Sequence, residues 1–124
     1  MEKKLEVIIS DIKKCLTPDL LKKEYREINK KNPMYGHCYV ATETLYHLLK
    51  DKNFKPHYGK DEDNITHWWL QDNHKNIIDV TKEQYTILNK EPPYNNGKRG
   101  AFLTLNPSKR SKILMDRING NKIS

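Results

Sequence analysis

The sequence has few cysteines and no long run of apolar residues, and each shortage excludes a class of protein. Its two cysteines, Cys15 and Cys38, are too few for a disulfide framework, and in a chain without an export signal two free thiols are expected rather than one bridge. The longest apolar runs are only a few residues, so no membrane span is expected. The start, MEKKLEVIISDIKKC, lacks the apolar block and cleavage site of a signal peptide, which predicts a cytoplasmic protein without a membrane partner.

Hydrophobic residues are scarce as well, at 35% of the 124 residues, while charged residues make up 31%. This composition predicts a single domain, residues 1–124, with a small core and a heavily solvated surface. The chain divides into N-terminal helices at 1–31, a central region at 32–89 that carries the candidate chemistry, and a basic strand and helix at 90–124.

Positive charge is present in excess, with a net charge of +7 that is unevenly distributed. Residues 90–124 hold eight basic and two acidic residues, a net charge of +6, which leaves +1 for residues 1–89. Such a segment suits an acidic or phosphate-bearing ligand, although a solvated charged face is the commoner explanation. Nucleic acid is not expected as a partner, because the basic residues occur without a recognised base-reading motif.

The spacing of apolar and turn-forming residues predicts an alternation of helices with short strands. Helices are predicted at 3–15, from Pro18 to about 31, and at 38–50, 82–88 and 107–118, and strands at 54–58, around 67, around 79 and at 101–105. This order predicts an α+β domain in which helices pack on a small antiparallel sheet.

Cys38 is predicted to lie in the first turn of a helix, because Pro33 and Gly36 end any earlier helix. Residues then recur at helical spacing on one face: Cys38, Ala41, Leu45, Leu48 and Leu49. A thiol at the start of a helix is close to the positive end of the helix dipole, which stabilises the thiolate. The thiolate is the form that a nucleophile requires.

His67 and Asp79 each lie in a short β-type run, and the residues between the runs, 72–75, resemble a hairpin turn. A hairpin that pairs residue 67 with residue 79, and Trp69 with Ile77, places both side chains on one face with Cβ atoms about 5 Å apart. The Asp79 carboxylate would then accept a hydrogen bond from one nitrogen of His67, while the other nitrogen faces Cys38. A register shifted by one residue would separate the two side chains.

A cysteine that opens a helix, followed by a histidine strand and then an aspartate strand, resembles the papain-like and transglutaminase-like thiol enzymes. More closely, NPMYGHCYVATETLYHLL with THWWL and IIDVTKEQY is similar to the small YunG-like proteins of bacteria and phages. The resemblance covers residues 32–85. It implies a papain/transglutaminase-like core with Cys38 as nucleophile, His67 as general base and Asp79 as orienting carboxylate. It names no substrate, and so short a chain leaves little room for the walls of a peptide cleft.

Each of these residues also has a purely structural interpretation. Cys38 alone fits a buried core cysteine, His67 a half-buried strand histidine, and Asp79 a cap for the helix that starts near Thr81. Two further side chains, His37 beside the cysteine and Trp69 beside the histidine, are predicted to contact substrate, although Trp69 also suits the core or the wall of a cleft. No cofactor is expected, and no metal site, because no histidine or cysteine pair has the tight spacing of a zinc motif.

The segment LNPSKRSK is the second functional candidate. Asn106 as N-cap, followed by Pro107, would leave free backbone N–H groups beside Ser108, Lys109 and Arg110, an arrangement that binds anions. Two functions are therefore predicted. The first is a cysteine-dependent hydrolase or acyl transferase that acts on an amide, isopeptide or thioester of a small molecule or protein. The alternative is a non-catalytic protein that binds a phosphate-bearing ligand or acidic partner through Lys109 and Arg110.

Overall fold

The computed structural model describes residues 2–21, 23–31, 36–102 and 106–123. Helices and strands follow one another along the chain as α1 (Glu2–Cys15), α2 (Arg26–Lys31), α3 (Cys38–Leu49), β1 (Lys55–Lys60), β2 (Thr66–Gln71), β3 (Ile77–Ile78), α4 (Glu83–Thr86), β4 (Lys98–Arg99) and α5 (Lys109–Ile123). Short 3-10 turns occur at Pro18–Leu20, Lys23–Tyr25 and Tyr94–Asn96.

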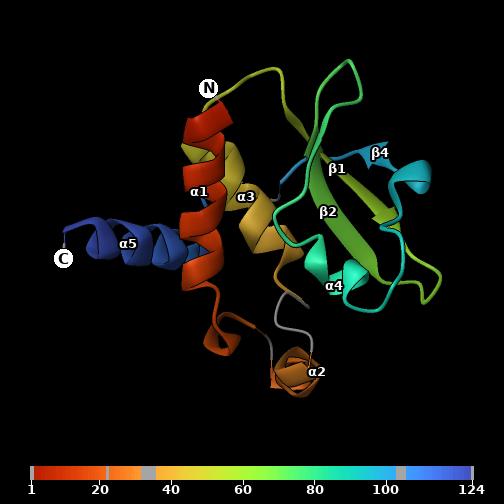
Figure 1. The fold of residues 1–124 in the computed structure, drawn as a ribbon, viewed down its shortest axis with the longest axis horizontal. Coiled ribbons are helices and arrows are strands. Elements are labelled where there is room, and N and C mark those ends of the chain that lie inside the picture. The colour runs from red at the N-terminus through yellow and green to blue at the C-terminus, as the bar shows by residue number, and fades with distance from the viewer. Residues whose placement is uncertain (1, 22, 32–35, 103–105, 124) are drawn as a thin grey trace.

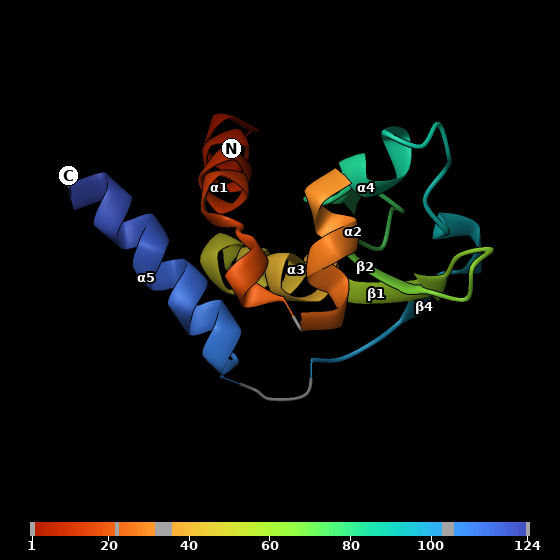
Figure 2. The same cartoon turned by 90° about the horizontal axis from the view of Figure 1, so that it is seen from below.

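The four strands form one antiparallel sheet in the order β3-β2-β1-β4. Helices α1, α3 and α5 pack together on one side of the molecule, and α3 lies between the other two helices and the sheet (Figures 1 and 2). The α+β class with a small antiparallel sheet is thus confirmed. No helix within the described residues is long and apolar enough to cross a membrane.

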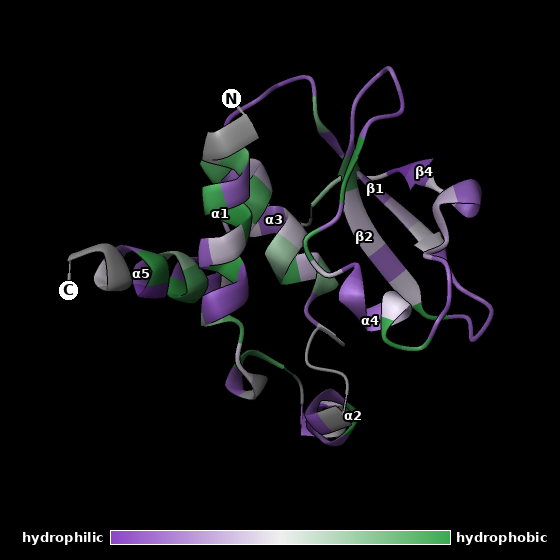
Figure 3. Cartoon of the chain, viewed as in Figure 1, coloured by the Kyte–Doolittle hydropathy of each residue, from purple (hydrophilic) through white to green (hydrophobic). Residues whose placement is uncertain are grey.

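The hydrophobic core lies between these three helices and the sheet. Its most deeply buried members are Ile12, Ala41, Leu45, Leu70 and Leu114, each with no exposed surface. Figure 3 shows hydrophobic residues on the helices and hydrophilic residues along the loops that extend from the sheet. Burying a leucine or isoleucine side chain stabilises a fold by about 2 kcal/mol, so these residues hold α3 in a fixed position against the strands.

Three predicted elements differ from the structure. The predicted helix from Pro18 is broken into two 3-10 turns and the six-residue α2, and Ile28 of α2 is 48% exposed instead of buried. The edge strand is β4 at 98–99; Ala101 and Phe102 are outside any strand, and the rest of the predicted strand, 103–105, lies outside the described residues. The helix predicted at 82–88 is the single turn α4, and the Thr81 hydroxyl makes no capping bond.

Candidate active site

Cys38 is the first residue of α3, as the sequence predicts. Its side chain is buried, with 7% of the residue exposed, and the thiol donates to the carbonyl oxygen of Thr66 in β2 at 3.7 Å. The first helical hydrogen bond runs from Ala41 N to His37 O at 2.9 Å, so the backbone amides of residues 38–40 precede it. Helix geometry leaves these amides without intrahelical acceptors, which makes them available to a negative charge formed near the sulfur.

Neither Cys15 nor Cys38 forms a disulfide. Cys15 is 4% exposed and belongs to the hydrophobic core, whereas Cys38 lies at the helix end beside β2. The two cysteines therefore differ in polar surroundings and not in burial, so they form a matched pair for reactivity measurements.

His67 and Asp79 form a short, buried hydrogen bond. Nε2 of His67 lies 2.6 Å from Oδ2 of Asp79, and the two side chains are 0% and 3% exposed. The predicted contact is thus present, with the carboxylate on one ring nitrogen. The other nitrogen, Nδ1, is buried and has no hydrogen-bond partner among the described residues.

The register that produces this contact differs from the predicted one. Strands β2 and β3 pair Leu70 with Ile78 and Gln71 with Ile77, which is a shift of two residues from the predicted pairing. The cause is the Asp72 side chain, whose Oδ1 accepts from the backbone amides of His74 and Asn76 and holds a five-residue loop, 72–76. A shift of two residues preserves the alternation of faces, so His67 still meets Asp79.

Asp79 is held by two further donors. The Tyr94 hydroxyl donates to Oδ2 at 2.7 Å, and the backbone amide of Thr81 donates to Oδ1 at 3.2 Å. Buried carboxylates need such donors to remain ionised. Sequence reasoning missed Tyr94, which lies in an irregular segment after Pro92 and Pro93, where no periodicity indicates the direction of a side chain.

The position of Tyr94 depends on Gly97. The Tyr94 ring meets the Trp69 ring edge-on at 5.1 Å between centroids, and Gly97 lies against the same indole. A Cβ atom at position 97 would come within 2.5 Å of Trp69 Cζ2, although the backbone there has an ordinary φ of −67°. The glycine allows the segment that carries Tyr94 to approach the indole closely.

The electrostatics of the site favour a proton on His67. Burial alone lowers the pKa of an imidazole, but hydrogen bonding and charge from Asp79, and a smaller contribution from Cys38, outweigh it and raise the pKa of His67 to about 9. Cys38 Sγ donates to the carbonyl oxygen of Thr66, the residue before His67, so the thiol lies against the strand that carries the imidazole. The site therefore brings together a thiol, a strongly basic imidazole and an orienting carboxylate.

Two of the residues predicted to contact substrate, His37 and Trp69, are fully buried. The Trp69 ring packs beside the His67 ring, with centroids 5.8 Å apart, and the Trp69 indole N–H donates to Gln71 Oε1 at 3.0 Å. Burial lowers the pKa of His37 to about 4, an effect that Asp19 partly opposes, and the ring is neutral at physiological pH. No three metal-ligating side chains cluster within the described part of the chain.

Lys109 and Arg110 are exposed at the start of α5, on the helical side of the molecule, and the predicted anion site beside them is already filled. The buried Glu43 carboxylate of α3 accepts from the Ser108 amide at 3.0 Å and from the Ser108 hydroxyl at 2.6 Å. The expectation of a free backbone donor at Ser108 is therefore wrong. A carboxylate within the chain takes the position that an external anion would occupy.

No model of a known protein family matches the chain, and comparisons with curated proteins and with solved structures gave no match.

Proposed function

We propose that the chain is a cysteine-dependent hydrolase or acyl transferase acting on an amide, isopeptide or thioester. The proposal depends above all on His67, whose Nε2 is bound to Asp79 at 2.6 Å, and on Cys38, whose thiol donates to the carbonyl oxygen of Thr66, the residue before this histidine. The order of a cysteine helix, a histidine strand and an aspartate agrees with a papain/transglutaminase-like core.

The proposed reaction uses each of the three groups once. In the reactive form the proton of the Cys38 thiol is already held by His67, whose pKa is raised to about 9, and the thiolate sulfur of this ion pair forms a bond to the acyl carbon. Amides at the start of α3 donate to the oxygen that becomes negative, and the leaving amine or thiol departs with the proton held by His67. Water or an amine then releases the acyl group. Asp79 stabilises the imidazolium and fixes the orientation of the ring.

Alkylation kinetics test the reactivity of the sulfur. The native protein is treated with iodoacetamide between pH 6 and pH 9, and modification of Cys38 and Cys15 is followed by peptide mass spectrometry. We expect Cys38 to react about tenfold faster than Cys15 at pH 6, because imidazolium stabilises the thiolate. His67→Gln should remove most of this difference. Equal rates for the two cysteines across the pH range would contradict the proposal.

An acyl adduct tests the chemistry directly. On incubation with a simple acetyl thioester, the acetyl group should appear on Cys38 and be lost again to water or to an added amine. The Cys38→Ser variant should show no adduct, whereas Cys15→Ser should behave as the parent protein. An adduct that forms equally on both cysteines would indicate unspecific acylation and not catalysis.

A further inference from the structure

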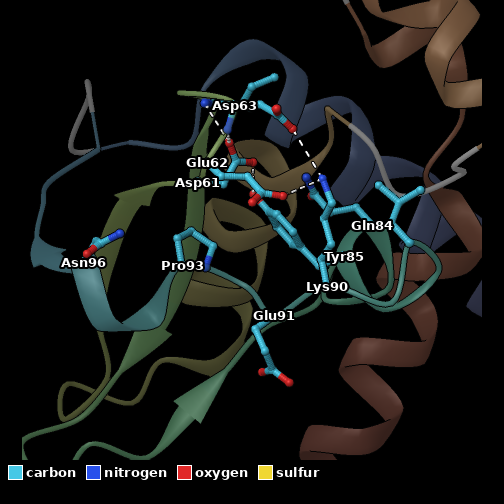
Figure 4. Close-up of a pocket in the computed structure, with 11 residues that line it drawn as sticks. Asp61, Glu62, Asp63, Gln84, Tyr85, Lys90, Glu91, Pro93 and Asn96 are labelled. Carbon is cyan, nitrogen blue, oxygen red and sulfur yellow. Dashed lines mark hydrogen bonds and ion pairs between the residues drawn. The ribbon is translucent and has the colours of Figure 1, made fainter.

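A cavity of about 440 Å³ lies beside the candidate active site. This volume is within the range of small-molecule sites in proteins. Tyr85 lines the cavity and also contacts the site, since its ring meets the His67 ring edge-on at 4.8 Å between centroids. The tyrosine hydroxyl donates to Asp61 Oδ2 at 2.8 Å on the cavity side (Figure 4). One side chain thus separates the cavity from the imidazole.

The residues that line the cavity carry a net negative charge, whereas the chain as a whole is positively charged. Four carboxylates and one ammonium line it: Asp61, Glu62, Asp63, Glu91 and Lys90. The chain as a whole has a net charge of +7, so the acidic lining is a local departure and not a consequence of composition. A cavity with surplus negative charge raises the local concentration of cations.

Part of the remaining wall is apolar. Ile65, Leu88 and Pro93 line the cavity, and Leu88 is 56% exposed. Lys90 shows which group such a lining accommodates, because its Nζ lies 2.7 Å from Glu62 and 3.6 Å from Asp63 (Figure 4). An alkylammonium group combines an apolar stem with a compact positive charge, and this lining offers a surface to each part.

We infer that this cavity is a specificity subsite that receives an alkylammonium group of the substrate, of the kind that ends a lysine side chain. The inference depends on the proposed function, because it places the reacting acyl carbon at Cys38, on the far side of Tyr85. The ammonium remains charged and takes no part in bond breaking. Its role is to bind and to orient the substrate through charge and apolar contact.

Two small thiosulfonate reagents test this inference at the active site. One carries an ammonium group and the other a sulfonate; in each case the Cys38 sulfur forms a disulfide with the reagent and methanesulfinate leaves. Rates on Cys38 are divided by the rates of the same reagents with a free thiol. We expect the normalised ratio of cationic to anionic reagent to exceed one by about fivefold or more, against the net charge of the chain.

Two sets of variants should change this ratio in opposite directions. Glu62→Gln with Asp63→Asn removes two exposed carboxylates from the mouth and should lower the ratio about fivefold or more, whereas Lys90→Gln should raise it. Glu27→Gln, an exposed acid on α2 that does not line the cavity, is the matched control and should leave the ratio unchanged. If Cys38 reacts readily and these variants leave the ratio unchanged, the inference fails and the proposed function stands.

A binding measurement tests the cavity without the thiol. Amide shifts of Leu88, Lys90 and Glu91 are followed by NMR during titration with Nα-acetyl-lysine methylamide and with its uncharged norleucine counterpart. We expect saturable shifts with the lysine compound only, and their loss in Glu62→Gln/Asp63→Asn. Equal responses to both compounds, or none, would overturn the subsite. An unreactive Cys38 combined with specific lysine binding would overturn the enzyme proposal and leave a binding site.

Discussion

At the scale of single residues, the His67–Asp79 contact makes a clear prediction. Replacing Asp79 by Asn removes the negative charge that raises the pKa of His67, so burial should then dominate and bring this pKa from about 9 to 6.5 or below. NMR titration of the His67 ring proton measures the change. The His37 ring, with a pKa of about 4, is the internal control and should titrate as before. A His67 pKa that stays near 9 would show that Asp79 is not its main partner.

Single residues also show what the sequence could and could not indicate. The contact of His67 with Asp79 was predictable, because the actual register differs from the predicted one by two residues, and a shift by an even number of residues keeps both side chains on one face. The register itself was not predictable, because it depends on a side chain: Asp72 holds two backbone amides and extends the loop. Tyr94 could not be found, because its contact with Asp79 depends on an irregular segment that packs on Trp69.

At the scale of elements, one buried acid links α3 to the start of α5, beside the hydroxyl pair Thr44–Ser111 at 2.7 Å and the apolar packing of Leu114. Glu43→Ala leaves the Ser108 amide and hydroxyl without their acceptor, and we expect the free energy of unfolding to fall by about 2 to 4 kcal/mol. Urea denaturation measures the loss. Lys109→Ala, one residue further along and exposed, should change the stability by less than about 0.5 kcal/mol. Similar losses for both variants would contradict a specific role for Glu43.

For α5, the spacing of apolar residues predicts that a helix is present, but it does not predict what the start of the helix contacts. Helical spacing predicts that Ile113, Leu114 and Ile118 face inward; Leu114 and Ile118 are buried, but Ile113 is 36% exposed, because only one stripe of the helix faces the core. Its predicted anion site assumed that the first amides face water. The Ser108 amide instead donates to Glu43 of α3, 65 residues earlier in the chain, which is placed there by tertiary packing that local sequence cannot reveal.

At the scale of the whole molecule, two buried histidines with opposite pKa shifts predict a maximum of stability near pH 6.5. Below it, the unfolded chain binds a proton at residue 37 that the folded chain does not take up until about pH 4, so stability falls as the pH falls. Above it, the folded chain keeps a proton on His67 up to about pH 9 that the unfolded chain has released, so stability falls as the pH rises.

Each histidine contributes a slope of about 1.4 kcal/mol per pH unit within its window, measured as the unfolding free energy in urea between pH 4.5 and pH 9. His37→Gln should reduce the slope of the stability profile only below pH 6.5, and Asp79→Asn should reduce it only above pH 6.5. A profile that remains unchanged in both variants would mean that other groups control the pH dependence.

Because Gly97 has no side chain, the segment that carries Tyr94 can pack on Trp69, and this packing bears on the acid–base chemistry of His67 and Asp79. Any larger residue there would collide with the Trp69 ring and push Tyr94 away from the carboxylate it supports. The proton affinity of the imidazole therefore depends on a residue that contacts neither the sulfur nor the acid by its side chain, because it has none, and acts only by letting the backbone pack on the indole. In this small domain, a position that tolerates no side chain is as much a requirement of the proposed chemistry as the sulfur.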